Sequence, residues 1–362
     1  MSWESELYVI KLKALSDSIY SKKMSLNEIK DHLEVIRYGK TYYEYARPGL
    51  LYFTEDLNAL TKELGVEKIV PMGLFIRGLY GGEKKTGEEK YAGLILLEHG
   101  VEGATFRFRL YNTKDTLVVP VDYLKEYGVK VYRMIYHGEI NPFRITRHLN
   151  IILSVQGEAM LKKFLEETLE LNARNISAET LNKMRKLIGE LRQPPSVKQL
   201  SMEKYYVAYR CVRAFTASVY VPVENSIAES HVSYVETRSE DVAYYYAAVL
   251  NYLAYIVLRS GRTFNRTQYA RPLLAIYIAG LSWNSVDENS RKRIVALSRR
   301  LHEKAPAKEY SNQRIALQEI ARLPEFKELV EILDAKVDKA KLNDALSLMS
   351  GVGIESNEGN AG

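Results

Sequence analysis

The 362-residue sequence contains a single cysteine, Cys211, and this scarcity excludes two kinds of covalently stabilised fold. One thiol cannot form an internal disulfide, and it cannot build a zinc site that needs several cysteines. Cys211 stands in an apolar, strand-like run, which favours a buried structural thiol over a nucleophile. We therefore expect a hydrophobic core to hold the fold together, and a chain of this length can bury a sizeable one.

Long apolar runs are also missing. The most apolar stretch, residues 243–258, is shorter than the roughly 20 residues that span a bilayer, and it contains Asn251. The first residues, MSWESELYVIKLK, carry acids early and lack the apolar run of a signal peptide. A hydrophobic content of 46% and a charged content of 27% are ordinary for a folded protein. These features predict a soluble, cytoplasmic protein with no membrane partner.

Motifs for catalysis or cofactor binding are equally scarce. Residues 82–86, GEKKT, lack the spacing of a phosphate-binding P-loop, and no glycine-rich strand-to-helix turn indicates a dinucleotide or S-adenosylmethionine site. The six histidines are scattered without metal-ligand spacing, and no G-x-S-x-G elbow is present. The sequence therefore predicts no cofactor, no metal site and no catalytic residue, and it leans against an enzyme that works alone.

The hydrophobic pattern predicts an α+β fold, with β-rich recognition units joined by a helical hairpin and an all-helical C-terminal domain. Short runs rich in β-branched and aromatic residues between residues 66 and 136 indicate strands, and from residue 157 the apolar spacing becomes helical. Ser25–Gly39 also reads as a helix, with a serine N-cap and a glycine stop. Helices are expected to start at Ser177 and Ser239.

Five segments follow from this pattern. They are a β-rich N-terminal domain (1–156), a helical spacer (157–195), an α/β unit (196–283), a helical C-terminal domain (284–350) and a disordered tail (351–362).

Basic residues concentrate between Arg259 and Arg300, where nine Lys or Arg face only Asp287 and Glu288. The net charge of the whole chain is +6, so this stretch carries the entire imbalance. A localised basic stripe is typical of a protein that binds a polyanion. The alternative is a solvated helix face without a partner.

Several segments between residues 138 and 349 resemble one family. They are GEINPFRI, KYYVAYRCVRAFTASVYVP, HVSYVETRSEDVAYYYAAVLNYLAYIV, GRTFNRTQYARPL and RIVALSRRLHEKA. Together they resemble the target-recognition and C-terminal region of N6-adenine DNA methyltransferases of the fused restriction–modification and phage-exclusion type, which are related to type I specificity subunits. The likeness lies in the order of elements and not in a catalytic signature.

The chain departs from that family where catalysis takes place. Such enzymes carry an Asn/Asp-Pro-Pro-aromatic loop that holds a flipped adenine. The nearest string here is Gln193-Pro194-Pro195-Ser196, which differs at both ends. The glycine-rich cofactor loop is absent as well. The resemblance therefore implies a reader of DNA sequence without its catalytic domain.

These observations predict a non-catalytic protein that recognises double-stranded DNA, as a specificity or accessory subunit beside a separate methyltransferase or restriction subunit. Arginine suits phosphates and guanine edges, and a glutamine amide suits adenine. The candidate DNA-binding residues are Arg144, Arg147, Arg210, Arg213, Arg259, Arg262, Arg266, Gln268 and Arg271. Two alternatives stay open: a protein-interaction module with a basic helical docking surface, and a Mg²⁺-dependent nuclease built on the E-x-K strings in residues 83–90.

Overall fold

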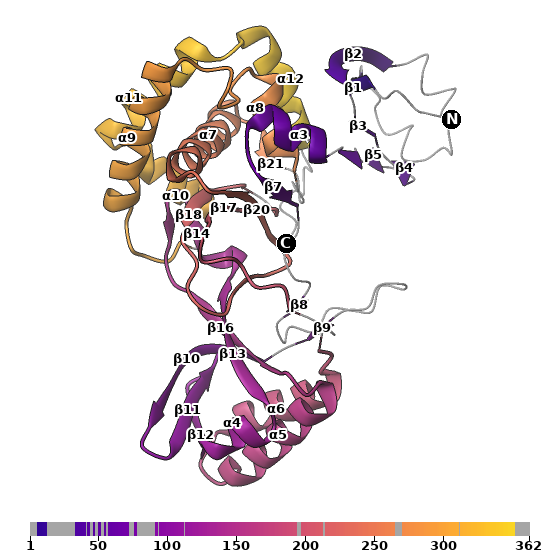
Figure 1. Ribbon diagram of the computed structural model, residues 1–362, viewed down its shortest axis with the longest axis vertical. Helices are drawn as coiled ribbons and strands as arrows, with labels where there is room; N and C mark the ends of the chain where they lie inside the picture. Colours follow the sequence, from indigo (N-terminus) through magenta and orange to yellow (C-terminus); the bar gives the residue numbers. More distant parts are fainter. Residues whose placement is uncertain are drawn as a thin grey trace, which may run out of the picture.

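The computed structural model describes residues 57–71 and 94–351, except for 112, 194–196, 213, 265–269 and 311, together with short strands within residues 6–55 and 76–92. The predicted α+β class is confirmed: two β-sheets, each covered by helices, form two lobes joined at a narrow waist (Figure 1). The C-terminal part is helical, as expected.

The lower lobe is built on a six-stranded sheet in the order β12-β11-β10-β16-β13-β19. The only parallel pair among these strands is β13–β19, where Ile135 lies opposite Ala228. The strands are β10 (Leu94–Glu102), β11 (Thr105–Leu110), β12 (Thr116–Pro120), β13 (Val129–Ile135), β16 (Leu149–Ser154) and β19 (Ser226–Ala228).

Three helices belong to this lobe: α4 (Asp122–Glu126), α5 (Glu158–Asn172) and α6 (Ala178–Glu190). Phe164 and Met184 of the α5–α6 hairpin share one buried cluster with Phe106 and Phe108 of the sheet. The hairpin is therefore not a separate spacer, because its apolar stripe needs the sheet surface to become buried.

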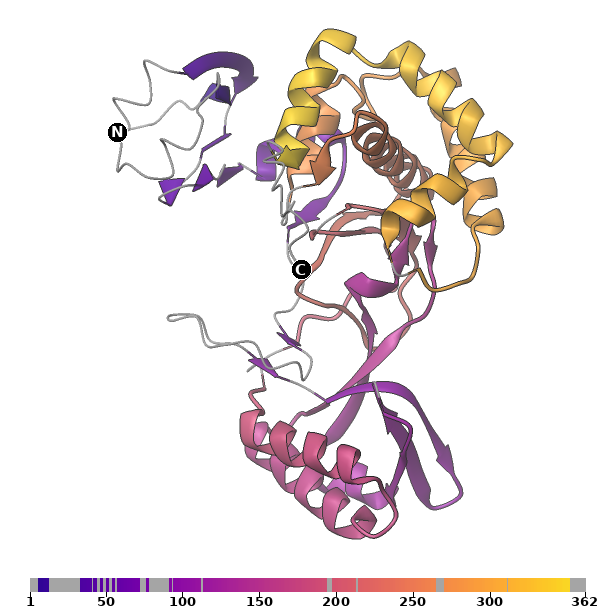
Figure 2. The ribbon, with the colours of Figure 1, turned by 180° about the vertical axis from the view of Figure 1, so that it is seen from behind.

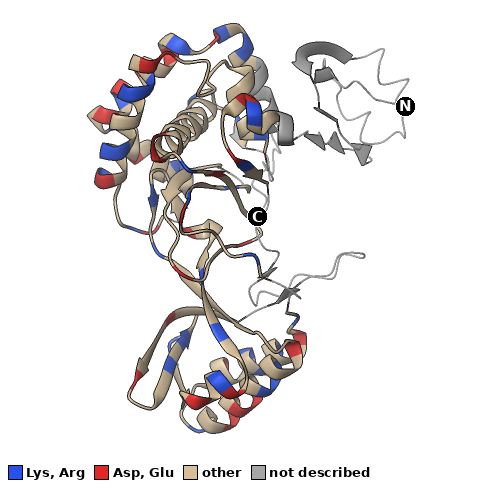
Figure 3. Cartoon of the chain, viewed as in Figure 1, with Lys and Arg blue, Asp and Glu red and all other residues tan. Residues whose placement is uncertain are grey.

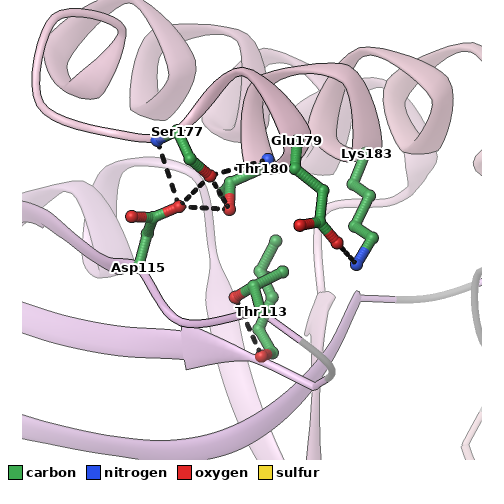
Figure 4. A network of polar contacts seen from close by, with 7 residues as sticks. Thr113, Asp115, Ser177, Glu179, Thr180 and Lys183 are labelled. Carbon is green, nitrogen blue, oxygen red and sulfur yellow. Dashed lines mark hydrogen bonds and ion pairs between the residues drawn. The ribbon is translucent and has the colours of Figure 1, made fainter.

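A polar network fixes α6 to the edge of this sheet (Figure 4). Ser177 is the N-cap of α6, as predicted, and its hydroxyl accepts a hydrogen bond from Thr180 N. The Ser177 amide donates to Asp115 Oδ2 at 3.1 Å, and the Thr180 hydroxyl donates to the same oxygen. The Ser177 hydroxyl also donates to Asp115 Oδ2, at 2.5 Å, and this hydrogen bond, together with those from the Thr180 hydroxyl and the Ser177 amide, holds the pKa of Asp115 below its usual value. One carboxylate thus joins the turn before β12 to the start of α6.

The upper lobe contains a four-stranded antiparallel sheet in the order β18-β17-β20-β7. Its strands are β7 (Lys68–Val70), β17 (Tyr205–Arg210), β18 (Ala217–Tyr220) and β20 (Val232–Thr237). The long helix α7 (Glu240–Arg259) packs on this sheet. Figure 2 shows α7 enclosed by an arc of C-terminal helices.

The surrounding helices are α3 (Leu57–Leu64), α8 (Arg271–Ile278), α9 (Glu288–Lys304), α10 (Gln313–Ile320), α11 (Pro324–Lys336) and α12 (Lys339–Met349). They share one buried cluster with α7 and with the sheet. The predicted boundary at residue 283 therefore runs through a single core, because buried side chains of α9, α10 and α11 belong to the same cluster as those of α7.

Helix α7 is long and apolar enough to cross a membrane by length and composition alone. However, 72% of its most apolar window is buried inside the protein. Its side chains are covered by the sheet on one side and by helices on the other. It is thus the central helix of the core of the upper lobe.

The waist joins the two sheets through a third buried cluster, which includes Ile135 and Ala228 from the lower sheet and Val232 from the upper one. A short 3-10 helix (η1, His137–Glu139) and the hairpin of β14 (Ile140–Asn141) and β15 (Arg144–Ile145) follow β13. Between them, Phe143 adopts a φ of 61° in the turn of this hairpin.

The remaining described strands form isolated pairs. These are β1 (Glu6–Leu12) with β2 (Leu33–Lys40), β3 (Tyr42–Tyr43) with β6 (Thr54–Glu55), β4 (Ala46–Arg47) with β5 (Leu50–Leu51), β8 (Ile76–Arg77) with β9 (Tyr91–Ala92), and β21 (Thr263–Phe264) with β22 (Ser350–Gly351).

Strand β2 corrects one prediction. The sequence from Ser25 to Gly39 indicated a helix, but Leu33–Lys40 pairs antiparallel with β1. The β-branched Val35 and Ile36 favour a strand, and pairing with a remote segment outweighs the local helical signal. Residues 25–32 and the predicted tail beyond residue 351 lie outside the described residues.

Candidate functional site

Two of the predicted DNA-binding arginines serve internal contacts at the waist. Arg144 Nη1 donates to the carbonyl oxygen of Ala305 at 3.0 Å, at the C-terminal end of α9. Arg147 forms ion pairs with Glu139 at 2.9 Å and with Glu309 at 2.6 Å. Both side chains therefore make contacts within the fold, and their role as DNA contacts stays a prediction.

Arg210 presents little surface to a ligand, because it lies at the end of β17 and is only 5% exposed. Arg213, Arg266 and Gln268 lie outside the residues that the structure describes, and so do the E-x-K strings of residues 83–90.

The basic stripe of the sequence is largely neutralised in space. Arg293 pairs with Glu328 of α11 at 2.8 Å, and Arg299 pairs with Glu240 and Asp241 of α7 at 2.9 Å each. These acids are remote in sequence, so counting charges along the chain could not reveal them. Figure 3 shows basic and acidic residues interspersed along α9 and α11. Most of α9 is therefore an ion-paired face and not a polyanion surface.

A smaller group of arginines gathers around strand β21. Arg259 is the exposed last residue of α7, and Arg262 immediately precedes β21. From α10, the guanidinium of Arg314 lies over the ring of Phe264 at 6.0 Å from its centroid. We call Arg259, Arg262 and Arg314 the β21 arginine cluster. Arg271 opens α8 on the other side of the same loop.

The cluster rests on rigid elements. Phe264 is half-buried and packs edge-on against Phe215 at 5.6 Å, and β21 pairs with β22. Neither Arg259 nor Arg314 forms an ion pair with a carboxylate within the described part of the chain. Arg262 Nη1 reaches the carbonyl oxygen of Asn343 at 3.5 Å. Arg314 is a site residue that the sequence analysis missed, because only the fold brings α10 beside β21.

A second group, at the waist, brings His137 to Glu229 and His231, which are close neighbours in the sequence. His137 Nδ1 lies 2.9 Å from Glu229 Oε2, and His231 Nδ1 lies 2.6 Å from Glu229 Oε1. The two imidazole rings are 5.0 Å apart, and Ser230 Oγ donates to Glu229 Oε1 at 2.9 Å. The histidines looked scattered in the sequence because 92 residues separate His137 from Glu229.

The carboxylate of Glu229 is held ionised. Burial alone would raise its pKa, but hydrogen bonds and charge interactions with His137 and His231 outweigh burial and lower that pKa to about 2. The side chain of Glu229 is 4% exposed, whereas those of His137 and His231 are 22% and 37% exposed. The acid therefore lies beneath two imidazoles that reach the surface.

Comparison of the sequence with protein-family models and with curated proteins finds no match. The candidate functions consequently depend on the residues and their geometry.

Proposed function

We propose that this chain is a non-catalytic protein that binds double-stranded DNA, as a specificity or accessory subunit of a DNA methylation or restriction system. The observation that carries the proposal is the β21 arginine cluster, in which Arg314 of α10 lies over the ring of Phe264 in β21, and Arg259 and Arg262 flank the end of α7 and the start of β21. The resemblance to target-recognition regions supports the same class of partner.

Guanidinium groups suit this task because they present planar, permanently charged donors that match phosphate oxygens. The cluster can neutralise phosphates with little loss of conformational entropy, because Phe264 and the paired strands already hold the backbone beneath it in place. Arg271 extends the cationic surface toward α8. Phosphate contacts of this kind position a protein on DNA, whereas base-edge contacts provide sequence specificity.

On this proposal the basic residues have two roles. The arginines at the waist and on α9 make contacts within the fold, and we assign the polyanion surface to the β21 arginine cluster. A separate methyltransferase or restriction subunit would supply the chemistry, since the chain lacks both the adenine-binding loop and the cofactor loop.

A charge-matched pair of triple variants tests the proposal. Arg259→Gln/Arg262→Gln/Arg314→Gln removes the cluster, and the control Arg107→Gln/Arg174→Gln/Arg185→Gln removes the same charge from surface positions of the lower lobe. At about 0.15 M salt, loss of three phosphate contacts weakens duplex binding by about 100-fold. The control should retain most of the affinity.

Two results would reject the proposal: no binding of duplex DNA by the wild-type chain at low salt, or equal loss of affinity in both triple variants. A protein complex that survives nuclease treatment, in a chain without DNA affinity, would favour the docking-module alternative.

A further inference from the structure

We propose that His137, Glu229 and His231 form a binding site for one divalent transition-metal ion, with Zn²⁺ as the ion that their chemistry matches best. This site lies at the waist and is independent of the β21 arginine cluster and of DNA binding. The three residues offer two imidazole nitrogens and one carboxylate, and their donor atoms all lie within 4.8 Å of one another.

The sheet topology creates this arrangement. Strands β13 and β19 run parallel with Ile135 opposite Ala228, so the chain leaves both strands at the same edge of the sheet. Glu229 is the first residue after β19, and its amide donates to Ile135 O at 3.1 Å. His137 is the second residue after β13, in η1. Two neighbouring carboxyl ends thus deliver the acid and one histidine to the same place.

The second histidine comes from the other lobe. His231 immediately precedes β20 of the upper sheet, and its carbonyl oxygen accepts a hydrogen bond from the Cys211 amide at 3.0 Å. The Val232 amide donates to Glu229 O at 3.0 Å and closes the turn between the two ligands. The backbone of this segment is therefore fixed on both sides, which lowers the entropic cost of assembling the site.

The observed distances are close to those of a coordinated ion. Donor atoms about 2.1 Å from a tetrahedral Zn²⁺ lie about 3.4 Å apart. The Nδ1–oxygen distances to Glu229 are 2.9 Å for His137 and 2.6 Å for His231. If an ion replaces the protons in these two hydrogen bonds, each imidazole must move away from the Glu229 carboxylate by less than about 1 Å.

The exposure of the three side chains decides what kind of site this is. Glu229 lies buried beneath the two partly exposed histidines, so an ion bound here has its remaining coordination position toward solvent. Two histidines and one glutamate with an open position are a donor set of catalytic zinc sites, which bind water or a substrate oxygen at the fourth position. The Ser230 hydroxyl donates a hydrogen bond to Glu229 Oε1 at 2.9 Å and so orients the carboxylate that would hold the ion.

The position of the site also gives it a mechanical consequence. His137 and Glu229 extend from strands of the lower sheet, and His231 leads into a strand of the upper sheet. A bound ion would cross-link the two lobes and stabilise the folded chain by RT ln(1 + c/Kd), where c is the concentration of free ion.

Metal content and stability of the full chain test this inference. The protein is stripped with a chelator, dialysed against Zn²⁺, and analysed for bound metal by mass spectrometry and for melting temperature. We expect about one Zn²⁺ per chain and a rise of several degrees in Tm at 100-fold excess over Kd. Co²⁺ in place of Zn²⁺ should give a d–d absorption band from a four- or five-coordinate ion.

His137→Gln and His231→Gln are the decisive variants, because both side chains are partly exposed and their loss should leave the fold intact. Each should weaken Zn²⁺ binding at least 100-fold and abolish the Tm rise. His99→Gln, at an exposed position on β10, is the matched control and should bind like the wild type. Binding of less than a tenth of an equivalent by the wild type, or binding by both histidine variants that is as tight as that of the wild type, would overturn the site.

Discussion

The side-chain amide of Asn251 holds the backbone of Ala217 from both sides. Ala217 N donates to Asn251 Oδ1 at 3.0 Å, and Asn251 Nδ2 donates to Ala217 O at 2.8 Å. Nδ2 also donates to Ala247 O within α7 at 2.9 Å. Asn251 is fully buried, so this pair is the polar link between the core helix and edge strand β18.

Replacing Asn251 with leucine should therefore destabilise the chain strongly. Leucine has nearly the same shape, but it leaves the amide of Ala217 buried without a partner, whereas the carbonyl of Ala217 keeps the hydrogen bond from the Phe143 amide at 2.8 Å. We expect a loss of about 1–3 kcal/mol in the free energy of unfolding, measured with urea. The control Asn182→Leu, on the exposed face of α6, should change stability by less than about 0.5 kcal/mol. Equal stability of the two variants would contradict this role.

His302 should make stability depend on pH. Its Nδ1 donates to Ser298 O at 2.8 Å and its Nε2 accepts from Val219 N at 3.0 Å, which fits only the neutral ring. Burial, opposed by the hydrogen bond to Ser298 and assisted by Arg299, lowers its pKa from 6.5 to about 4. Between these two pKa values, the unfolded chain therefore binds a proton on this histidine that the folded chain does not bind.

The contribution of His302 is fully present above pH 6.5 and is lost as the pH falls from 6.5 to 4, by up to about 3 kcal/mol. His302→Gln should flatten the decline measured by urea unfolding at several pH values. A residual decline remains, because burial also lowers the pKa of His148 to about 4. His99→Gln should keep the wild-type slope, and an unchanged slope in His302→Gln would refute the assignment.

Replacing Arg147 should lower the stability of the chain without changing its affinity for duplex DNA. It neutralises Glu139, which is 4% exposed and also accepts a hydrogen bond from the Thr146 hydroxyl at 2.7 Å. Arg147→Met leaves a buried carboxylate and should cost about 2–3 kcal/mol. Arg147→Met/Glu139→Gln should recover much of the loss, and the duplex affinity of both variants should match the wild type. A selective loss of DNA affinity would restore Arg147 as a contact.

Cys211 should be chemically inert in the native chain. Its side chain is 1% exposed, and burial together with Glu229 raises the pKa of the thiol to about 12. A thiol reagent should therefore label the chain only as fast as the chain unfolds. Because the sequence has one cysteine, labelling kinetics report directly on this position. Fast labelling of the native protein would contradict the buried position.

Local signals in the sequence predicted the elements well. Ser177 and Ser239 cap α6 and α7 as expected, Gly261 follows the end of α7, and Pro324 is the first residue of α11. These features depend on a few neighbouring residues, so a single sequence carries them.

The sites were harder to predict because they depend on contacts between remote segments. The acids that neutralise Arg299 come from α7, and the Arg314 that completes the β21 arginine cluster comes from α10. The histidine cluster depends on the parallel pairing of β13 with β19, for which no local pattern exists. Counting charges along the chain therefore overestimated the extent of the basic surface. The spacing of the histidines in the sequence gave no sign that two of them meet at one carboxylate.

The salt dependence of duplex binding tests the central claim most directly. Four arginines, Arg259, Arg262, Arg271 and Arg314, give a slope of about −4 for log K against log salt, at about −0.9 per phosphate. The triple variant Arg259→Gln/Arg262→Gln/Arg314→Gln should reduce that slope to about −1. A wild-type slope near zero, or a slope that the triple variant leaves unchanged, would contradict the account.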